Sequence, residues 1–289
     1  MATELSLTKN STSVIPRGIV EAKLKASQYQ MDIIALLLAE IGKKSDIDDN
    51  LEYHLTVEQF AELKDLSNTH EACRVLRDYI CGNTNNNDES MRHIGFELYI
   101  GENEFHHYNW FDKISYKDGI ATFTLTPDIK KFLVDFKKND KTRVYAKLRY
   151  VLPMKSVYSK RIYLMCRNFT TSGIRFCDTD WDVFKAKLQI PDSYRYLHIK
   201  KNVLDKAVEE INEISDITIS YTISEKNVQR GKQPVAIRFY IQRKDVEEDY
   251  LNVEEQKDEV VQDIESMTDE EIKAQMERMA AILENRKGK

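Results

Sequence analysis

The chain has 289 residues, with 43 basic and 48 acidic side chains and a formal net charge of −5. This length predicts about two domains of roughly 100–200 residues each, and 42% hydrophobic residues suffice for a folded core. The longest strongly apolar run, Ile33–Ala39, is far shorter than the roughly 20 residues that cross a bilayer, so we expect no membrane association. The N-terminal residues show no secretion signal, and a cytoplasmic protein is expected.

Motifs that would indicate an enzyme or a bound cofactor do not occur in the sequence. Neither phosphate-binding glycine pattern, G-x-x-x-x-G-K-[ST] or G-x-G-x-x-G, is found. The four cysteines form no C-x-x-C pair. His106 and His107 are adjacent, whereas a zincin needs two histidines four residues apart on a helix. We therefore expect no catalysis, metal or cofactor, and interpret both histidines as polar strand or loop residues.

The charge is distributed very unevenly along the chain. Residues 1–140 have a net charge of −7, residues 141–244 of +11 and residues 245–289 of −9. A strongly basic block between two acidic ones is typical of a polyanion-binding module with neighbours of other function.

The first segment, 1–140, shows the order helix, helix-turn-helix and β-ribbon of a winged-helix domain. Its helices are indicated by apolar side chains on one face and by capping residues at Ser27, Thr56 and Thr69. Its strands are indicated by alternating apolar residues. The expected helices are 28–41, 56–63, 69–81 and one starting at 127, and the expected strands are 51–55, 95–100, 109–116 and 120–125.

The second segment, 141–244, repeats this order. We expect helices at 154–169, 178–188 and 195–214, and a hairpin of strands 217–223 and 235–241 around a basic loop. The fold class is therefore α+β: two tandem winged-helix domains with a C-terminal acidic helical tail. In the tail, 245–289, a charged linker precedes an expected helix at 270–285, which is interpreted either as an interaction helix or as a solvated tail.

The helix 195–214 is predicted to have an apolar inner face and a basic outer face. Its N-terminal half is basic and its C-terminal half acidic, which suits a helix whose first turns enter the major groove of DNA. A solvated amphipathic helix would show a similar face, but the basic hairpin loop beside it favours DNA because wing residues contact backbone phosphates. The candidate DNA-binding residues are Arg195, His198, Lys200, Lys201 and Asn202 on the helix, and Lys226, Arg230 and Lys232 on the hairpin.

The corresponding helix of the first segment supplies parallel candidates. Thr69 is placed at its start, and His70, Arg74 and Arg77 share one face by their i, i+4, i+7 spacing. Because this segment is acidic overall, a purely structural or protein-contact role remains an equal alternative.

Over residues 12–244 the sequence resembles the iteron-binding plasmid replication initiators, a family with two winged-helix domains. The resemblance rests on Leu148–Phe169, on Trp181–Ile190, and on the stretches SYRYLHIKKNVLDKAVEEINEISDITISYT and QRGKQPVAIRFYI. It divides the chain into an N-terminal winged-helix domain (1–140), a C-terminal winged-helix domain that is the main iteron reader (141–244), and a tail (245–289) outside the family core.

The resemblance also implies function and partners. The family's basic cluster corresponds to Lys200, Lys201 and Asn202, where Asn202 departs from the usual Arg or Lys. The first domain would contact the other half-site and help form a homodimer in equilibrium with monomer. Family members initiate as monomers on direct-repeat iterons in double-stranded DNA, repress their own gene as dimers on an inverted-repeat operator, and recruit the host initiator and replicative helicase. The expected location is the bacterial cytoplasm.

Two other classes stay open. A winged-helix transcriptional regulator without a replication role would share the fold. A rolling-circle initiator would nick DNA through a tyrosine, but none of the 15 tyrosines is followed three residues later by lysine, the common companion of that nucleophile.

Overall fold

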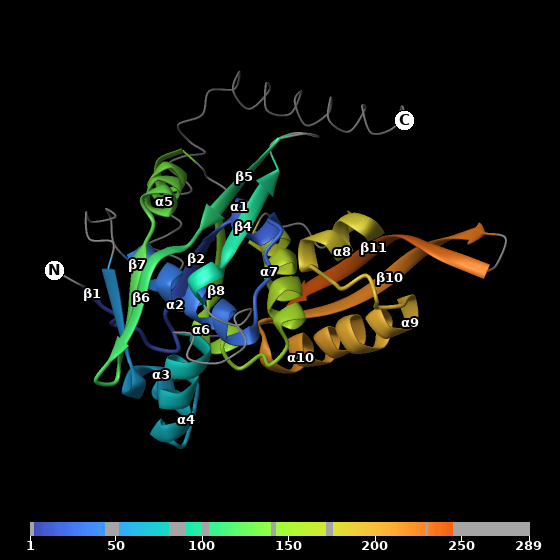
Figure 1. Ribbon diagram of the computed structural model, residues 1–289. Helices are drawn as coiled ribbons and strands as arrows, with labels where there is room; N and C mark the ends of the chain where they lie inside the picture. The colour runs from blue at the N-terminus through green and yellow to red at the C-terminus, as the bar shows by residue number, and fades with distance from the viewer. Residues whose placement is uncertain are drawn as a thin grey trace, which may run out of the picture. The chain divides into compact units, whose positions relative to one another are not determined.

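A mixed four-stranded sheet and an antiparallel three-stranded sheet, each beside a helix-turn-helix, organise the protein in the computed structural model (Figure 1). The structure describes residues 3–43, 52–80, 91–99, 104–139, 143–171, 176–228 and 231–244. Residues Met1–Lys244 form one unit, and the tail Asp245–Lys289, with the helix expected at 270–285, lies outside the described residues.

The N-terminal module is built around a nearly fully buried helix, α2 (Gln28–Lys43). Ser27 and Gln30 cap it reciprocally, as the sequence predicts: the Ser27 hydroxyl accepts from the Gln30 amide, and the Gln30 side chain accepts from the Ser27 amide. Residues 33–39 are at most 3% exposed, so this helix is enclosed on all sides. It therefore lies at the centre of a core that the strands and the helix-turn-helix complete with their own buried side chains.

Four strands and a helix-turn-helix surround this core. The sheet has the order β1 (Thr3–Glu4), β3 (Glu52–Thr56), β7 (Ile120–Leu125), β6 (Phe111–Lys117). The helix-turn-helix consists of α3 (Val57–Leu63), α4 (Thr69–Arg74) and a π-helical segment (Val75–Ile80) that continues α4. Further elements are the hairpin β4 (Gly95–Tyr99) with β5 (Phe105–Asn109), the short helix Met91–His93, and helix α5 (Pro127–Asn139). The capping box of Thr56 and Gln59 at the start of α3 is confirmed.

The beginning of the chain pairs with a strand far along the sequence. Strand β2 (Thr12–Pro16) is antiparallel to β8 (Arg143–Lys147), and the short helix α1 (Arg17–Glu21) follows it. The charge pattern places the division between the modules after residue 140, but this pairing joins residues 143–147 to the N-terminal module. Neither strand was predicted, because each owes its conformation to the other rather than to a local pattern.

The C-terminal module contains a three-stranded sheet of order β10–β11–β9. Its elements are β9 (Phe176–Asp180), α8 (Trp181–Leu188), α9 (Tyr196–Ile199), a π-helical segment (Lys200–Asp205), α10 (Lys206–Ile214), β10 (Ile217–Val228) and β11 (Gly231–Arg243). The expected helix 178–188 begins only at Trp181, because Asp180 caps it after the unpredicted strand β9. Between the modules lie α6 (Leu148–Val151) and α7 (Val157–Thr171), and α7 packs against elements of both.

A buried ionic cluster joins α7 to the N-terminal core. The Lys160 ammonium lies 2.5 Å from one oxygen of Asp32 on α2, and the Lys64 ammonium lies 2.8 Å from the other. Lys160 also donates to the carbonyl of Val151, and Lys64 to that of Leu152. The side chains of Lys160 and Asp32 have no exposed surface, and burial lowers the pKa of Lys160 to about 8. Two ammonium groups thus depend on one carboxylate.

Replacing Asp32 by Ala is expected to lower the free energy of unfolding by about 3–5 kcal/mol, because it leaves two buried ammonium groups without their anion. Urea unfolding of the variant measures the loss. The control is Glu62→Ala on the exposed side of α3, which should change stability by about 0.5 kcal/mol or less. A loss below about 1 kcal/mol in Asp32→Ala would show that the cluster does not hold the two elements together.

Stability is also expected to depend on the protonation of Lys160. Its pKa of about 8 in the folded chain is below the ordinary 10.5, so between these values the unfolded chain binds more protons. The contribution of Lys160 to the free energy of unfolding therefore rises as the pH increases from about 8 to about 10, by up to about 3 kcal/mol. The free energies of unfolding of wild type and of Lys160→Met, measured across this pH range, test this prediction. The stability of wild type relative to Lys160→Met should increase as the pH rises, and a constant difference between the two would contradict the prediction.

Candidate nucleic-acid interface

The recognition helix of the C-terminal module, residues 196–214, is continuous but not a regular α-helix. Its buried residues Ile199, Val203, Ala207 and Ile211 recur every four positions. In an α-helix of 3.6 residues per turn such a row would drift around the axis. The wider π-helical turns of Lys200–Asp205 offset that drift and keep the row against the core. The expectation of one regular α-helix over 195–214 is corrected accordingly.

The outer face of this helix brings together the basic residues that the sequence singled out. Arg195, His198, Lys200 and Lys201 are exposed, and Asn202 is half-buried beside them. Within the described residues, Arg195, Lys200 and Lys201 form no ion pair with an acidic side chain. The His198 ring packs on that of Tyr194, with 4.1 Å between centroids. The result is a group of basic side chains that face solvent, of which Arg195, Lys200 and Lys201 have no acidic partner among the residues that the structure describes.

Two acidic side chains of the same helix, Asp205 and Glu210, bond to neighbouring parts of the protein. Asp205 accepts a hydrogen bond of 2.6 Å from the Tyr221 hydroxyl on β10, and burial together with this bond raises the pKa of Tyr221. Glu210 accepts from the backbone amides of Lys155 and Ser156 before α7. These carboxylates therefore fix the helix to its surroundings and do not neutralise the basic first turns.

The wing of the C-terminal module is longer than the sequence analysis expected. The loop predicted between 223 and 235 is largely strand, because β10 extends to Val228 and β11 begins at Gly231. Lys226 and Lys232 are exposed near the end of this hairpin, and Lys232 lies 3.7 Å from Glu225. The Tyr196 hydroxyl donates to the same carboxylate at 2.8 Å, so Glu225 ties the wing to the recognition helix. Arg230 lies outside the described residues.

In the N-terminal module, the equivalent helix also combines α and π turns. Asn68, not Thr69, is its N-cap: the Asn68 side chain accepts from the His70 amide, and Thr69 is the first helical residue, so that expectation was wrong. The buried residues Ala72, Leu76 and Ile80 again recur every four positions across the π-helical segment. Because π turns follow Arg74, the α-helical spacing assumed between Arg74 and Arg77 does not hold.

The basic candidates of this helix differ in how strongly they are neutralised. His70, Arg74 and Arg77 are all exposed. Arg77 binds Asp78 through two contacts of 2.7 and 3.1 Å, and this hydrogen-bonded pair lowers the pKa of the Asp78 carboxyl and raises that of Arg77. The cationic surface is therefore weaker here than on the C-terminal helix.

A wing beside the N-terminal helix-turn-helix contains a lysine that the sequence analysis did not select. Strands β6 and β7 are joined at Asp118 and Gly119, whose φ angles of 50° and 80° place both in the left-handed region that this tight turn requires. The side chain of Lys117, at the turn, is 88% exposed. The Gly119 carbonyl accepts from the Val57 amide, which fixes the turn beside α3. The Asp-Gly pair between alternating stretches would have identified this wing.

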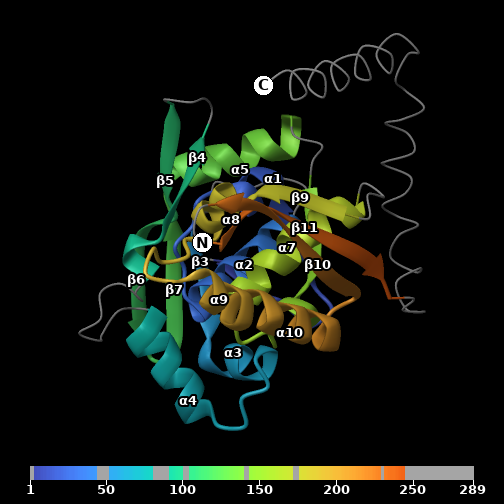
Figure 2. The ribbon, with the colours of Figure 1, turned by 90° about the vertical axis from the view of Figure 1, so that its right-hand side faces the viewer.

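The first helix-turn-helix and the recognition helix of the C-terminal module lie on the same side of the described part of the chain. In Figures 1 and 2 α3, α4, α9 and α10 all lie in the lower part, whereas in Figure 1 α8 lies above strands β10 and β11. Helix α5 lies in the upper part in both views. One DNA duplex along the lower side could therefore meet both units.

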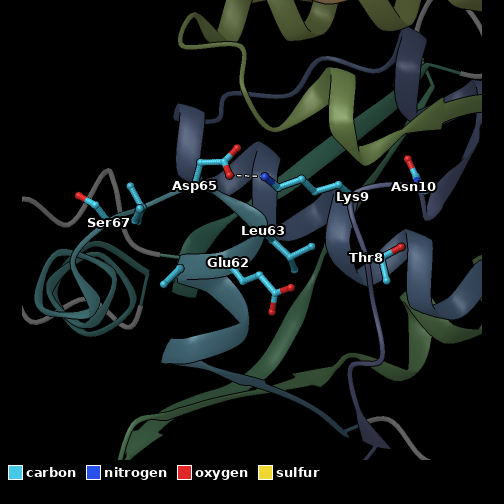
Figure 3. A pocket seen from close by; sticks show the side chains of 9 residues that line it. Thr8, Lys9, Asn10, Glu62, Leu63, Asp65 and Ser67 are labelled. Carbon is cyan, nitrogen blue, oxygen red and sulfur yellow. Dashed lines mark hydrogen bonds and ion pairs between the residues drawn. The ribbon is translucent and has the colours of Figure 1, made fainter.

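An open pocket of about 630 Å³ lies where the N-terminal segment meets the first helix-turn-helix (Figure 3). Lys9 reaches across it to form an ion pair with Asp65, which occupies a left-handed conformation in the turn (φ 54°). This contact holds residues 8–10 against the turn, and because it neutralises Lys9, the pocket offers little positive charge.

The described residues contain no group of three His, Cys, Asp or Glu side chains that could hold a metal ion. His106 and His107 are both exposed on β5, which makes them strand residues. In the same part of the chain no helix is long and apolar enough to cross a membrane.

Two helix-turn-helix units, each with a β-hairpin wing, define a tandem winged-helix protein. The first winged-helix domain of the family described as Initiator Replication protein matches residues 16–167, more than half of the chain, and the second winged-helix domain of the Initiator Rep proteins matches residues 180–241. The chain therefore belongs to the initiator replication protein family. The first match ends at residue 167 and the second begins at residue 180.

Solved structures share this fold. Among the 21 chains that match is that of the Pi initiator protein in complex with iteron DNA. It is 17% identical to this chain, with a TM-score of 0.64, and the alignment covers 82% of this chain and 100% of that one. At this identity the likeness establishes the fold alone. No curated protein is similar enough to count as a match.

Proposed function

We propose that this protein initiates plasmid replication by binding direct-repeat iterons in double-stranded DNA through both winged-helix domains. The observation that carries the proposal is the cluster of Arg195, Lys200 and Lys201, which faces solvent and has no acidic partner in the described part of the chain, on a helix shaped to enter the major groove. The family membership and the fold shared with the Pi initiator, which was crystallised on iteron DNA, support it.

The two modules would bind different halves of each repeat. The C-terminal recognition helix reads bases with its first turns, and Asn202 suits adenine, which an amide side chain binds through two hydrogen bonds. Lys226 and Lys232 on the wing contact backbone phosphates. The N-terminal module, with His70, Arg74, Arg77 and the wing residue Lys117, meets the other half of the repeat. A repeat of roughly 20 base pairs, about two helical turns, suits two such modules on one side of a duplex.

Assembly and partners follow the family pattern. Monomers would act on direct repeats and dimers would repress the protein's own gene on an inverted-repeat operator, with the host initiator and replicative helicase as partners. The proposal assigns no enzymatic step to the chain. Incubation with a supercoiled origin plasmid and Mg²⁺ should leave the DNA uncut, and a covalent protein–DNA adduct would favour the nicking initiator instead.

Replacing both Lys200 and Lys201 by Ala should weaken binding to the repeat and lower the slope of log affinity against log salt by about two, one per lost phosphate contact. Fluorescence anisotropy at several salt concentrations measures both. The charge-matched control is Lys130→Ala/Lys131→Ala on α5, in the upper part of Figures 1 and 2, which should leave the slope unchanged. Equal slopes for all three proteins would contradict the assignment of the recognition helix.

The same variants separate initiation from regulation alone. A plasmid whose only origin is the gene with its flanking DNA should be maintained with wild type and lost with the Lys200→Ala/Lys201→Ala variant. If wild type binds the repeat but never supports such a plasmid, the chain is a transcriptional regulator.

A further inference from the structure

One apolar side chain on the recognition helix is far more exposed than any other large apolar group in the described residues. Leu197, the second residue of α9, is 73% exposed, whereas the next values are 53% for Phe105 and 52% for Tyr99. An exposed leucine contributes little to folding, since its stabilising effect of roughly 1.5–3 kcal/mol requires burial. The fold therefore does not explain why this position is apolar.

The position of Leu197 on the helix is fixed by the row of buried residues. Ile199 and Val203 face the core, and the four-residue repeat that they begin also places Leu197 in line with Lys201, on the outer side. Arg195 precedes it and Lys200 follows one turn later, both exposed. Leu197 is thus a single apolar group inside the cationic surface that the proposed function assigns to DNA.

This setting favours a nucleic-acid base over a protein partner. Protein interfaces bury a contiguous apolar core that lacks charged residues, whereas Leu197 is flanked by Arg195 and Lys200, which attract a polyanion and form no ion pair with any described residue. In the major groove, the apolar group that distinguishes one base pair from the others is the C5-methyl of thymine. The first residues of a recognition helix are also those that reach base edges.

We propose that Leu197 packs against the C5-methyl group of a thymine in the half of the site that the C-terminal module reads, and so makes binding specific for thymine at that base pair. The proposal rests on the proposed function and adds a specificity-determining residue to it. The neighbouring lysines bind phosphates whatever the sequence, so Leu197 contributes base selectivity that they do not supply.

The test compares thymine with deoxyuridine, which lacks only the methyl group. The full chain first enriches its preferred duplex from a library of random duplexes, and each thymine of that duplex is then replaced singly by deoxyuridine. Replacement of thymine by deoxyuridine at one position should weaken binding by wild type about fourfold, which is the effect of removing one buried methyl group. Leu197→Ala should bind the thymine duplex roughly five- to tenfold more weakly and should not respond to the replacement there.

Two control variants separate the contact from a general effect on the helix. Leu197→Met keeps an apolar side chain of similar volume and should retain the response to deoxyuridine. Val183→Ala removes another exposed apolar side chain, on α8, and should also retain it. Because Leu197 is exposed, Leu197→Ala should unfold at the same urea concentration as wild type.

The outcomes distinguish this proposal from the one on which it rests. In one outcome wild type enriches a duplex and binds it in a salt-dependent way, yet responds equally to every deoxyuridine or in the same way as Leu197→Ala. In that case Leu197 makes no contact with a thymine, and the proposed function stands. If no duplex is enriched, both proposals are overturned.

Discussion

Helix α7 carries two adjacent buried cations, and the placement of both winged-helix modules depends on them. Lys160 binds Asp32 of α2 on the side of the N-terminal core. Arg161 donates to backbone carbonyls of both modules: those of Val20, Ala22 and Leu24 at 2.8–3.4 Å, and that of Lys187 at the end of α8 at 3.1 Å. A buried charge is tolerated only where hydrogen bonds compensate it, and the two terminal nitrogens of Arg161 obtain theirs only when these segments are all present around α7 at once.

This constraint links the fold to the site. Burial lowers the pKa of Arg161 to about 10, so the guanidinium still carries its charge at neutral pH and still requires its carbonyl acceptors. Farther along α7, the Tyr163 hydroxyl donates to the buried carboxylate of Asp216, just after α10. The same helix therefore holds α2 of one module and α8 and α10 of the other. The spacing between the two helix-turn-helix units, and hence between the base pairs they can meet, is set by contacts within the protein before any DNA binds.

Local patterns in the sequence predicted the parts of the fold whose cause is local. Ser27 and Thr56 cap helices as expected, and strand 120–125 has the predicted bounds, because caps and alternation depend on neighbouring residues. Strands β2, β8 and β9 were missed because each is stabilised by a partner distant in sequence. The pair Lys160-Arg161 would be taken for a solvated face by its residue type, and only the tertiary structure shows that both side chains are buried. The basic residues of the site were found from charge, but the freedom of Arg195, Lys200 and Lys201 from ion pairs within the described residues was not predictable.

That freedom explains how a chain with a net charge of −5 can present a cationic face. The recognition helix also contains four carboxylates, all from Asp205 onward, and in isolation they would cancel much of its field. Asp205 accepts from the Tyr221 hydroxyl, and Glu210 accepts amide hydrogen bonds before α7, so these two acids bond to neighbouring parts of the protein and not to the basic first turns. Because charges are screened beyond a Debye length of about 8 Å, a phosphate interacts with the side chains nearest to it and not with the net charge of the whole chain. The local arrangement of charge on the first turns of this helix, rather than the net charge, therefore determines whether the surface attracts DNA.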